Sequence, residues 1–436
     1  MDIIRMALCR IKLSNSKWEA ALSICLVGIL GSVGSRPAFL RVSRCSESSG
    51  NYATFEEEGI QDIPAVTDAC QACAWTFTVL AHRRIKLASK PYYKPLKHWD
   101  DKIEQERTIL RLLVLREKIR SEIPVKTARD TLLLATWNIR EFKDNRLPES
   151  YHYLAEIIDA FDFVAVQEVS TDLAGLVQVM NLLGGHWDYL VTDATEGSAG
   201  GGERMAFLYD KRKITFRNMA GEIVLPPHLK INEGAVQFAR TPFLAAFQAG
   251  WFKFTICTVH IYYGSASLNS AGMQRRIAEI SAIGNWLRRK AKRENTNYIL
   301  LGDFNIEDPE HLTMKALEDT GFYIPEALRD KPTDLGRSKF YDQIAFRLAE
   351  GDMVRFRKDR PAAGAFDFSE VVMTPGDLRT YLPYFTEKVV GKTERQVRSY
   401  YEKTWRTLQL SDHLPLWVSL RIDFSDEYLR GLLRDH

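Results

Sequence analysis

From residue 131 onwards the sequence predicts an α/β fold, in which helices cover the faces of β-sheets. Short apolar runs rich in β-branched and aromatic residues alternate there with longer amphipathic segments. Of the 436 residues, 45% are hydrophobic and 26% are charged, so the chain has enough apolar side chains to bury one large core or two smaller ones. This composition excludes wholesale disorder.

The first 45 residues contain a basic segment followed by an apolar one. Arg5, Arg10, Lys12 and Lys17 precede an apolar stretch from residue 20 to residue 34. This arrangement resembles a signal peptide or a weak membrane anchor, although the stretch is short for a membrane span and no clean small-x-small cleavage site follows it. A non-native extension and a buried helix are the alternatives. Residues 20–34 are therefore the candidate segment for export or membrane association.

Residues 46–128 are interpreted as a linker followed by a helical extension. Residues 46–62 are polar, acidic and rich in turn formers, which is typical of a linker or loop. The apolar stretch 65–81 is interrupted by an aspartate and a glutamine, which favours a packed helix over a membrane span. Apolar residues at near-helical spacing from 101 to 122, followed by Pro124, predict an amphipathic helix that leads into the main domain.

Cysteine content and charge exclude two classes of protein. Six cysteines without regular spacing cannot form the disulfide framework of a small secreted module. Cys70 and Cys73 form one C-x-x-C pair, but without a second Cys or His pair nearby two ordinary thiols are favoured over a zinc site. Residues 1–130 contain 21 basic and 15 acidic residues, and the remainder contains 38 and 41. Because the basic excess lies mostly outside the α/β region, a protein that coats nucleic acid by charge alone is not indicated.

Four apolar runs of the α/β region each end on polar or ionisable residues. Residues 131–137 end before Asn138, residues 161–166 before Gln167 and Glu168, residues 254–259 before His260, and residues 298–302 before Asp303 and Asn305. Taken alone, each tip is explained by a structural hydrogen bond or a turn. Taken together, these side chains are expected to converge on one rim of the sheet core.

A covering helix is predicted between two of these runs, over residues 273–293. Ile277, Ile280, Ile283, Trp286 and Leu287 lie on one helical face, and arginine and lysine residues lie on the other. No internal repeat of fixed period is apparent, so the sequence does not support a solenoid or a propeller.

The residue types at the strand ends predict a particular chemistry. Asn, Glu and Asp oxygens at these strand ends, with no cysteine and few histidines, suit a hard cation, Mg²⁺ with Mn²⁺ as the alternative. His260 and His413 can exchange protons near neutral pH. A hard cation together with histidines and carboxylates indicates hydrolysis of a phosphate ester, in which positive charge offsets the phosphate oxygens and a base activates water.

A set of motifs in fixed order resembles the endonuclease/exonuclease/phosphatase superfamily, and most closely its deoxyribonuclease I-like branch. The motifs are ATWNIREF, FVAVQEV, GERMAFLYD, TVHIYYG, LLGDFNIE, YDQIAF, GAFDF and LSDHLPLWVSL. The resemblance covers about residues 131–424, which places the catalytic domain at 129–424 and leaves 425–436 as a C-terminal tail. It implies a four-layer sandwich of two packed mixed β-sheets flanked by helices, with a divalent-metal phosphodiesterase or phosphatase site at one end.

The resemblance also implies roles for individual residues. By similarity Glu168 is the principal metal ligand, Asn138 a nearby metal and phosphate ligand, and Asp412 lies near the metal or a second metal. Asp303 and Asn305 match the pair that positions the nucleophilic water and holds the scissile phosphate. His260 and His413 match the two histidines around that phosphate, oriented by Glu203 and Asp342. Arg240 and Arg140 match substrate-binding arginines, and Arg140 favours one metal over two.

Departures from the branch bear on the substrate. Ser170 replaces an arginine that usually follows QEV, and the glycines at 200–202 replace a tyrosine that packs into the DNA minor groove, which puts minor-groove binding in doubt. Residues 200–202 are interpreted either as a phosphate-cradling loop or as a hairpin tip. The disulfides of secreted members have no counterpart, because only Cys257 lies in the domain, so a cytoplasmic location is favoured over export.

The expected function is that of a nuclease acting on nucleic acid as a Mg²⁺-dependent phosphodiesterase, and no protein partner is indicated. The alternatives are a phosphatase or phospholipase-type esterase on a small or lipid phosphoester and a non-catalytic binding protein that kept the fold. Residues 381–406 form an insertion in which six basic residues are interleaved with aromatics. Either it clamps single-stranded or irregular nucleic acid by phosphate contact and stacking, or it is a helix with a basic face and a buried aromatic stripe.

Overall fold

The computed structural model of this chain describes residues 93–195, 201–231, 236–349, 355–356 and 363–434. All of them lie in one compact unit, Leu87–His436. The signal- or anchor-like segment, the linker, the helix expected at 65–81 and the C-x-x-C pair lie outside the described residues. Within the described part of the chain, no helix is both long and apolar enough to cross a bilayer.

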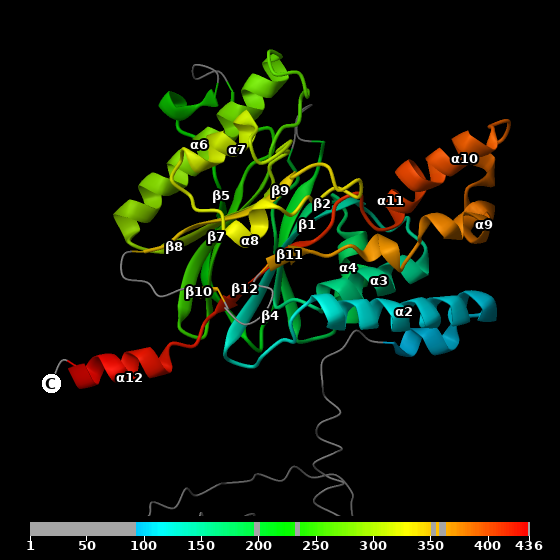
Figure 1. Ribbon diagram of the computed structural model, residues 1–436, viewed down its shortest axis with the longest axis horizontal. Helices are drawn as coiled ribbons and strands as arrows, with labels where there is room; N and C mark the ends of the chain where they lie inside the picture. The colour runs from blue at the N-terminus through cyan, green and yellow to red at the C-terminus, as the bar shows by residue number, and fades with distance from the viewer. Residues whose placement is uncertain (1–92, 196–200, 232–235, 350–354, 357–362, 435–436) are drawn as a thin grey trace, which may run out of the picture. The chain divides into compact units, whose positions relative to one another are not determined.

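Two mixed β-sheets lie at the centre of this unit (Figure 1). The first sheet has the strand order β10 (Arg355–Phe356), β12 (Leu416–Arg421), β1 (Thr131–Phe142), β2 (Phe163–Val169), β4 (Arg204–Asp210) and β3 (Trp187–Val191), and β11 (Ala363–Ala365) also pairs with β12. The second sheet has the order β5 (Ile214–Glu222), β6 (Phe243–Ala249), β7 (Phe252–His260), β8 (Asn297–Asp303) and β9 (Asp342–Arg347).

Helices connect and flank these strands. The α-helices are α2 (Lys102–Glu122), α3 (Pro148–Ile158), α4 (Ala174–Leu183), α6 (Ala271–Glu294), α7 (Leu312–Glu318), α8 (Glu326–Arg329), α9 (Leu378–Tyr381), α10 (Glu394–Tyr400), α11 (Arg406–Gln409) and α12 (Ser425–Arg434). Short 3₁₀ turns comprise η2 (Lys94–His98), η3 (Pro227–Leu229), η4 (Phe368–Glu370), η5 (Pro375–Asp377), η6 (Leu382–Tyr384) and η7 (Thr386–Lys388), and η8 (Tyr401–Trp405) is a π-helical turn. The predicted tail therefore contains helix α12.

The two sheets pack face to face, as the sandwich requires. Strands β1 and β2 contact β7 and β8 across the interface, and the Phe163 ring of the first sheet lies 5.1 Å from the Phe247 ring of the second. Alternation along β1 divides its side chains between two cores. Leu132 belongs to the core between the sheets, whereas Leu133 belongs to the core beneath α2, α3 and α4. Helices α6 and α7 flank the second sheet (Figure 1), so the predicted four-layer architecture is confirmed.

Helix α6 spans the predicted covering helix, and Ser270 caps its N-terminus by accepting a hydrogen bond from the Met273 amide at 3.1 Å. The predicted division into an apolar and a basic face was only partly right. Arg276 and Glu279 are fully buried on the inner face, whereas Ile277 and Trp286 are only partly buried. A buried charge on an inward helical face requires polar partners from elsewhere in the chain, and the site supplies them.

Candidate active site

Strand pairing brings the polar tips to one edge of the sandwich. Strand β1 runs parallel to β2, with Asn138 opposite Gln167, and β7 runs parallel to β8, with His260 opposite Asp303. Strand β9 runs antiparallel to β8 and begins at Asp342, which lies opposite Asp303. Because the carboxyl ends of parallel strands share an edge and an antiparallel neighbour begins there, the tips must meet. The convergence expected from the sequence is therefore observed.

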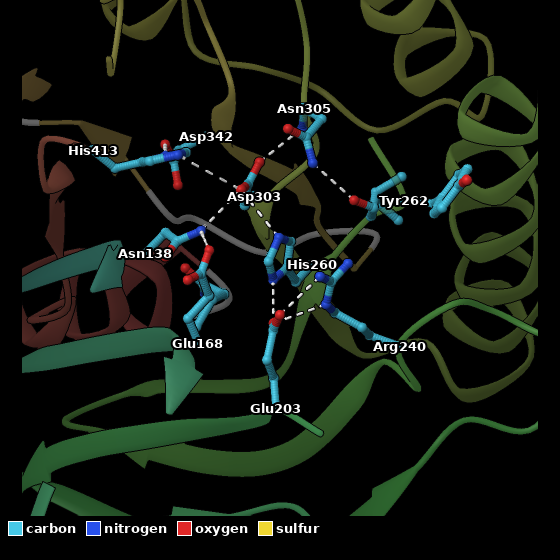
Figure 2. Close-up of polar contacts among 12 residues, drawn as sticks. Asn138, Glu168, Glu203, Arg240, His260, Tyr262, Asp303, Asn305, Asp342 and His413 are labelled. Atoms are coloured by element: carbon cyan, nitrogen blue, oxygen red, sulfur yellow. Dashed lines mark hydrogen bonds and ion pairs between the residues drawn. The ribbon is translucent and has the colours of Figure 1, made fainter. Parts of the chain in front are cut away.

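Asp303 lies at the centre of the cluster (Figure 2). Its Oδ2 accepts a hydrogen bond from Asn138 Nδ2 at 3.1 Å and lies 3.5 Å from His260 Nε2 and 3.9 Å from His413 Nε2. Its Oδ1 accepts a hydrogen bond from the Asn305 amide at 2.8 Å. The Asp303 side chain is 2% exposed, so a carboxylate held by four polar groups is almost sealed from solvent.

His260 is held by a carboxylate that also binds an arginine. His260 Nδ1 donates to Glu203 Oε2 at 2.9 Å, and Arg240 donates to both Glu203 oxygens at 2.8 Å. Burial and the charge of Arg240 oppose protonation of His260, but the hydrogen bond to Glu203 and the negative charge of Asp303 outweigh them and raise its pKa. Despite burial, the hydrogen bonds from His260 and Arg240 lower the pKa of Glu203 to about 2.

His413 is held by a carboxylate without an arginine partner among the described residues. His413 Nδ1 donates to Asp342 Oδ2 at 2.7 Å, and the His413 ring lies 5.4 Å from the Tyr341 ring. Although burial opposes it, the charges of Asp342 and Asp303 raise the pKa of His413 well above its ordinary value. Burial in turn raises the pKa of Asp342. The protonated form of the His413 imidazole is therefore favoured.

Asn305 adopts a left-handed backbone conformation with a φ of +54°, which asparagine tolerates better than most residues. This turn directs its amide to Asp303, and its Nδ2 donates to the Ile261 carbonyl at 2.8 Å. The turn therefore ties the end of β8 to the residue that follows His260.

An oxygen-lined group beside Asp303 fits a hard divalent cation. Asn138 Nδ2 donates to Glu168 Oε1 at 2.9 Å, whereas Asn138 Oδ1 is buried and has no hydrogen-bond partner in the described part of the chain. Glu168 has a strained φ of +60°, and its Oε2 accepts from the Glu141 amide at 2.9 Å. The described residues contain no group of three or more His, Cys, Asp or Glu side chains placed to hold a metal. One or two protein oxygens are nevertheless typical of Mg²⁺, which keeps several waters and binds substrate phosphates.

Three expected site residues, Arg140, Asp412 and Arg240, make no hydrogen bond to Asp303 or to Glu168 and are paired with other side chains. Arg140 Nη1 lies 3.4 Å from Asp412 Oδ2 and donates to Thr407 Oγ1 at 2.7 Å. The Asp412 side chain is 43% exposed, and its expected proximity to a metal stays a prediction. Arg240 is hydrogen-bonded to Glu203, so its guanidinium reaches His260 only through this carboxylate.

The glycine-rich stretch shapes the approach of Glu203. Gly201 and Gly202 have φ values of +68° and +69°, a region that favours glycine. A Cβ on Gly201 would come within 2.9 Å of Glu203 Oε1. The Thr171 hydroxyl donates to the Gly202 carbonyl at 2.8 Å. These contacts favour the turn interpretation for the two described glycines, and Gly200 lies outside the described residues.

Buried polar residues that sequence reasoning missed support the site. Arg276 is fully buried. Its guanidinium donates to the Asn305 carbonyl at 2.8 Å and to Glu307 Oε1 at 2.9 Å. Gln167 Nε2 joins the two sheets by donating to Thr136 on β1 and to Thr258 on β7. A signal for Arg276 was present, because residues 273, 276, 280, 283 and 287 share one helical face and only the second is charged.

The insertion at 381–406 has a buried aromatic stripe. Tyr381, Phe385, Tyr401 and Trp405 all belong to the core that lies outside the first sheet. These rings are consequently not free to stack on bases, so the helix interpretation holds for them. The basic side chains Lys388, Lys392, Arg395, Arg398 and Lys403 are exposed. Tyr384 is 39% exposed, so a clamp at this insertion would act through charge and through this ring.

The comparison with known protein families agrees with the motifs. Residues 135–344 match the model of the Endonuclease/Exonuclease/phosphatase family. Similar solved structures include D. rerio TDP2 humanized by 14 mutations, with 13% identity, 67% of this chain and 99% of that chain covered and a TM-score of 0.41. The human Nocturnin catalytic domain with bound sulfate shows 14% identity, coverage of 66% and 94% and a TM-score of 0.42. A mannosyl-6-phosphatase from Bacteroides thetaiotaomicron shows 16% identity, coverage of 66% and 99% and a TM-score of 0.42.

No curated protein matches the chain in sequence. The family match spans the end of β1, the QEV motif of β2, His260 on β7, the GDFN turn and the start of β9. The segment 135–344 of this chain therefore belongs to the endonuclease/exonuclease/phosphatase family, as its motifs indicated.

Proposed function

We propose that this protein is a divalent-metal-dependent phosphodiesterase that hydrolyses nucleic acid. The observation that carries the proposal is the position of Asp303 Oδ2, 3.5 Å from His260 Nε2 and 3.9 Å from His413 Nε2. A carboxylate between two imidazoles with raised pKa values can take a proton from water while the charged rings face an anionic phosphate. Accepting a proton from water needs a negative charge, and binding a phosphate needs a positive one. Asp303 and the two imidazoles provide both within one cluster.

In the proposed reaction, Asp303 orients a water molecule and accepts its proton. The water oxygen forms a bond to phosphorus, the bond from phosphorus to the leaving oxygen breaks, and one of the two imidazolium groups supplies the proton that the leaving oxygen takes. Asn138 and the Asn305 amide each hold one oxygen of Asp303, which restricts its rotation. Glu203 and Asp342 keep the imidazoles oriented through Nδ1, so that each Nε2 is directed at the reacting group.

Glu168 and Asn138 are the residues proposed to hold Mg²⁺, with Mn²⁺ as the alternative. The buried Asn138 Oδ1 without a described partner supports this assignment, because a cation would satisfy it. When bound, the ion would offset negative charge on the phosphate oxygens. Asp412 was also expected near the metal, and its pairing with Arg140 favours a single ion at Glu168.

Nucleic acid is the proposed substrate because exposed positive charge lies beside the site. Arg140 follows Asn138 by two residues on β1, and its Nη1 lies 3.4 Å from the Lys403 carbonyl of the insertion. The insertion therefore reaches the residue that lies two positions after Asn138, and five of its basic side chains are exposed. Such a surface suits a substrate with several phosphates, since each phosphate contact adds to affinity.

A substrate panel tests the proposal directly. Plasmid, single-stranded DNA, RNA, inositol phosphates and sphingomyelin are incubated with the protein in Mg²⁺ and in EDTA. We expect hydrolysis of the nucleic acids in Mg²⁺ and loss of that activity in EDTA. Glu168→Gln should raise the Mg²⁺ concentration needed for half-maximal rate by tenfold or more, roughly the effect of one lost charged ligand. The exposed Glu117→Gln on α2 serves as the matched control.

Two results would contradict the proposal. Equal rates of hydrolysis in EDTA and in Mg²⁺ would show that the reaction does not depend on a divalent metal. Turnover confined to inositol phosphates or sphingomyelin would replace the nuclease with the esterase that the sequence left as an alternative.

A further inference from the structure

Tyrosines lie next to both histidines of the site. Tyr262 and Tyr263 follow His260 by two and three residues, on the loop between β7 and α6, and the Tyr263 residue is 42% exposed. Tyr341 directly precedes Asp342, and its ring lies 5.4 Å from the His413 ring. Burial and the neighbouring Glu307, Tyr263, Asp334 and Asp303 raise the pKa of the Tyr341 hydroxyl. The Tyr341 carbonyl accepts a hydrogen bond from the Phe304 amide at 2.8 Å, which ties Tyr341 to the residue after Asp303.

A buried guanidinium supports the Tyr263 ring from behind. The guanidinium carbon of Arg276 lies 4.3 Å from the centroid of the Tyr263 ring, and Arg276 has no exposed surface. Arg276 Nε also donates to the Tyr263 carbonyl at 2.9 Å. Because one face of the ring is covered by this side chain, the exposed surface of Tyr263 must lie on the rest of the ring. The attraction between the guanidinium and the ring face helps to fix the position of the ring.

Two glycines hold the tyrosine loop against helix α6. Gly264 has a φ of +66°, and a Cβ there would come within 2.6 Å of the Gly272 Cα. A Cβ on Gly272 would in turn come within 2.9 Å of the Gly264 Cα. Only glycine permits such a close approach of two backbones. The loop is thus shaped before substrate arrives, and pre-organisation reduces the entropy lost when a ligand is bound.

A lysine completes the surface. Lys339 lies two residues before Tyr341, its Nζ lies 2.8 Å from Glu307 Oε2, and its side chain is 39% exposed. The hydrogen bond to Glu307 and the nearby Tyr263 contribute to the raised pKa of Lys339. Glu307 also accepts a hydrogen bond from Arg276, whose guanidinium covers the Tyr263 ring, so this ammonium group and that ring are linked through one carboxylate. A cation and an aromatic ring in one site suit a ligand that carries both an anionic phosphate and a planar base.

We propose that Tyr263, Tyr341 and Lys339, here called the tyrosine rim, bind a nucleotide next to the scissile phosphate by stacking on its base. This inference rests on the proposed function and deepens it, because it assigns the substrate class as single-stranded or unpaired nucleic acid. A base in a duplex is already stacked on both faces, whereas an unpaired base can stack on a tyrosine.

The test compares two polymers with the same phosphate backbone. Fluorescently labelled oligo(dT) and a base-free deoxyribose phosphodiester of equal length are titrated with the protein in EDTA, so that no turnover occurs. Wild-type protein should bind oligo(dT) about 5- to 100-fold more tightly, the range expected for stacking of one base. Tyr263→Leu should bring this ratio close to one, and Tyr263→Phe should keep it.

Tyr323→Leu is the matched control, because Tyr323 is 56% exposed and pairs with Phe346, near the end of β9 remote from Asp342. Its affinity ratio should equal that of the wild type. Equal affinity of the wild type for both polymers, or an unchanged ratio in Tyr263→Leu, would overturn the inference. Circular dichroism shows whether Tyr263→Leu is folded. If it is not, Tyr263→Phe alone tests the inference, and equal affinity of that variant for the two polymers would overturn base stacking.

The proposed function fails by a different result. If the wild type discriminates between the polymers in EDTA but hydrolyses no nucleic acid in Mg²⁺, the tyrosine rim stands and the phosphodiesterase does not. If it hydrolyses both polymers at equal rates and binds them equally, the phosphodiesterase stands and base stacking does not.

Discussion

His260 and His413 approach the same oxygen of Asp303, and each is hydrogen-bonded through Nδ1 to a carboxylate of its own. The carboxylates differ in their surroundings. Glu203 is shared with Arg240, whereas Asp342 is fully buried and its Oδ1 has no described hydrogen-bond partner. The pKa of His260 is raised, and that of His413 is raised well above its ordinary value. The positive charge of Arg240 offsets part of the negative charge of Glu203, and this limits the rise in the pKa of His260.

This comparison indicates different roles for the two rings. A group whose pKa is raised further keeps its proton over more of the pH range and serves more as a positive charge. A group whose pKa is raised less can release and regain a proton during turnover. We therefore expect His413 to act mainly as a charge on the phosphate and His260 to take the larger part in proton transfer.

The largest effect is expected from removal of either ring. His260→Ala and His413→Ala should each lower kcat by about 10²- to 10⁴-fold, the usual contribution of an acid–base group. Steady-state rates on single-stranded DNA in Mg²⁺ measure this effect. His228→Ala, at an exposed turn in η3, is the control. Near-normal rates in both site variants would break the two-histidine scheme.

Removal of the supporting carboxylates should separate the two histidines. Asp342→Asn should lower the pKa of His413, because it removes the negative charge bound to Nδ1, and Glu203→Gln should lower that of His260 by a smaller amount. Each histidine is charged below its own pKa and loses the charge as the pH rises through it. The alkaline limb of the activity profile should therefore move to lower pH in both variants. Histidine proton titration by NMR in EDTA measures the two pKa values, and a larger fall at His260 than at His413 would reverse the comparison.

The smallest effect is expected from Arg240→Gln, which keeps a hydrogen-bond donor to Glu203 and removes the positive charge. Because the charge of Arg240 lowers the pKa of His260, the variant should raise that pKa and bring it closer to the pKa of His413. The same NMR titration detects the change. Arg217→Gln is the control, since Arg217 is exposed and bound to the neutral Gln248. An unchanged pKa of His260 in Arg240→Gln would show that Arg240 only positions Glu203.

Patterns local in sequence carried much of the prediction. The strand tips, the α/β class and the extent of helix α6 follow from apolar runs and their periodicity. The pairing of Glu203 with His260 and of Asp342 with His413 was expected only from the family resemblance, since nothing in the local sequence joins residues 57 and 71 positions apart.

Other features required the folded chain. Arg276 was expected on the solvent side of its helix because charged residues usually are. Its partner Glu307 lies 31 residues further along the chain. The aromatic residues of the insertion were compatible with either a stacking surface or a core, and the core outside the first sheet decided between them.

The sequence by itself determined which residues end the buried strands and that their oxygens and imidazoles suit phosphate chemistry. Only the tertiary structure decided that Asp303 stands between two histidines, that Arg140 takes Asp412 as its partner, and that Arg276 supports Tyr263 from within. Strand order and register bring distant residues together, and burial then selects their partners, because a charge removed from water must find its counterpart wherever the fold places one.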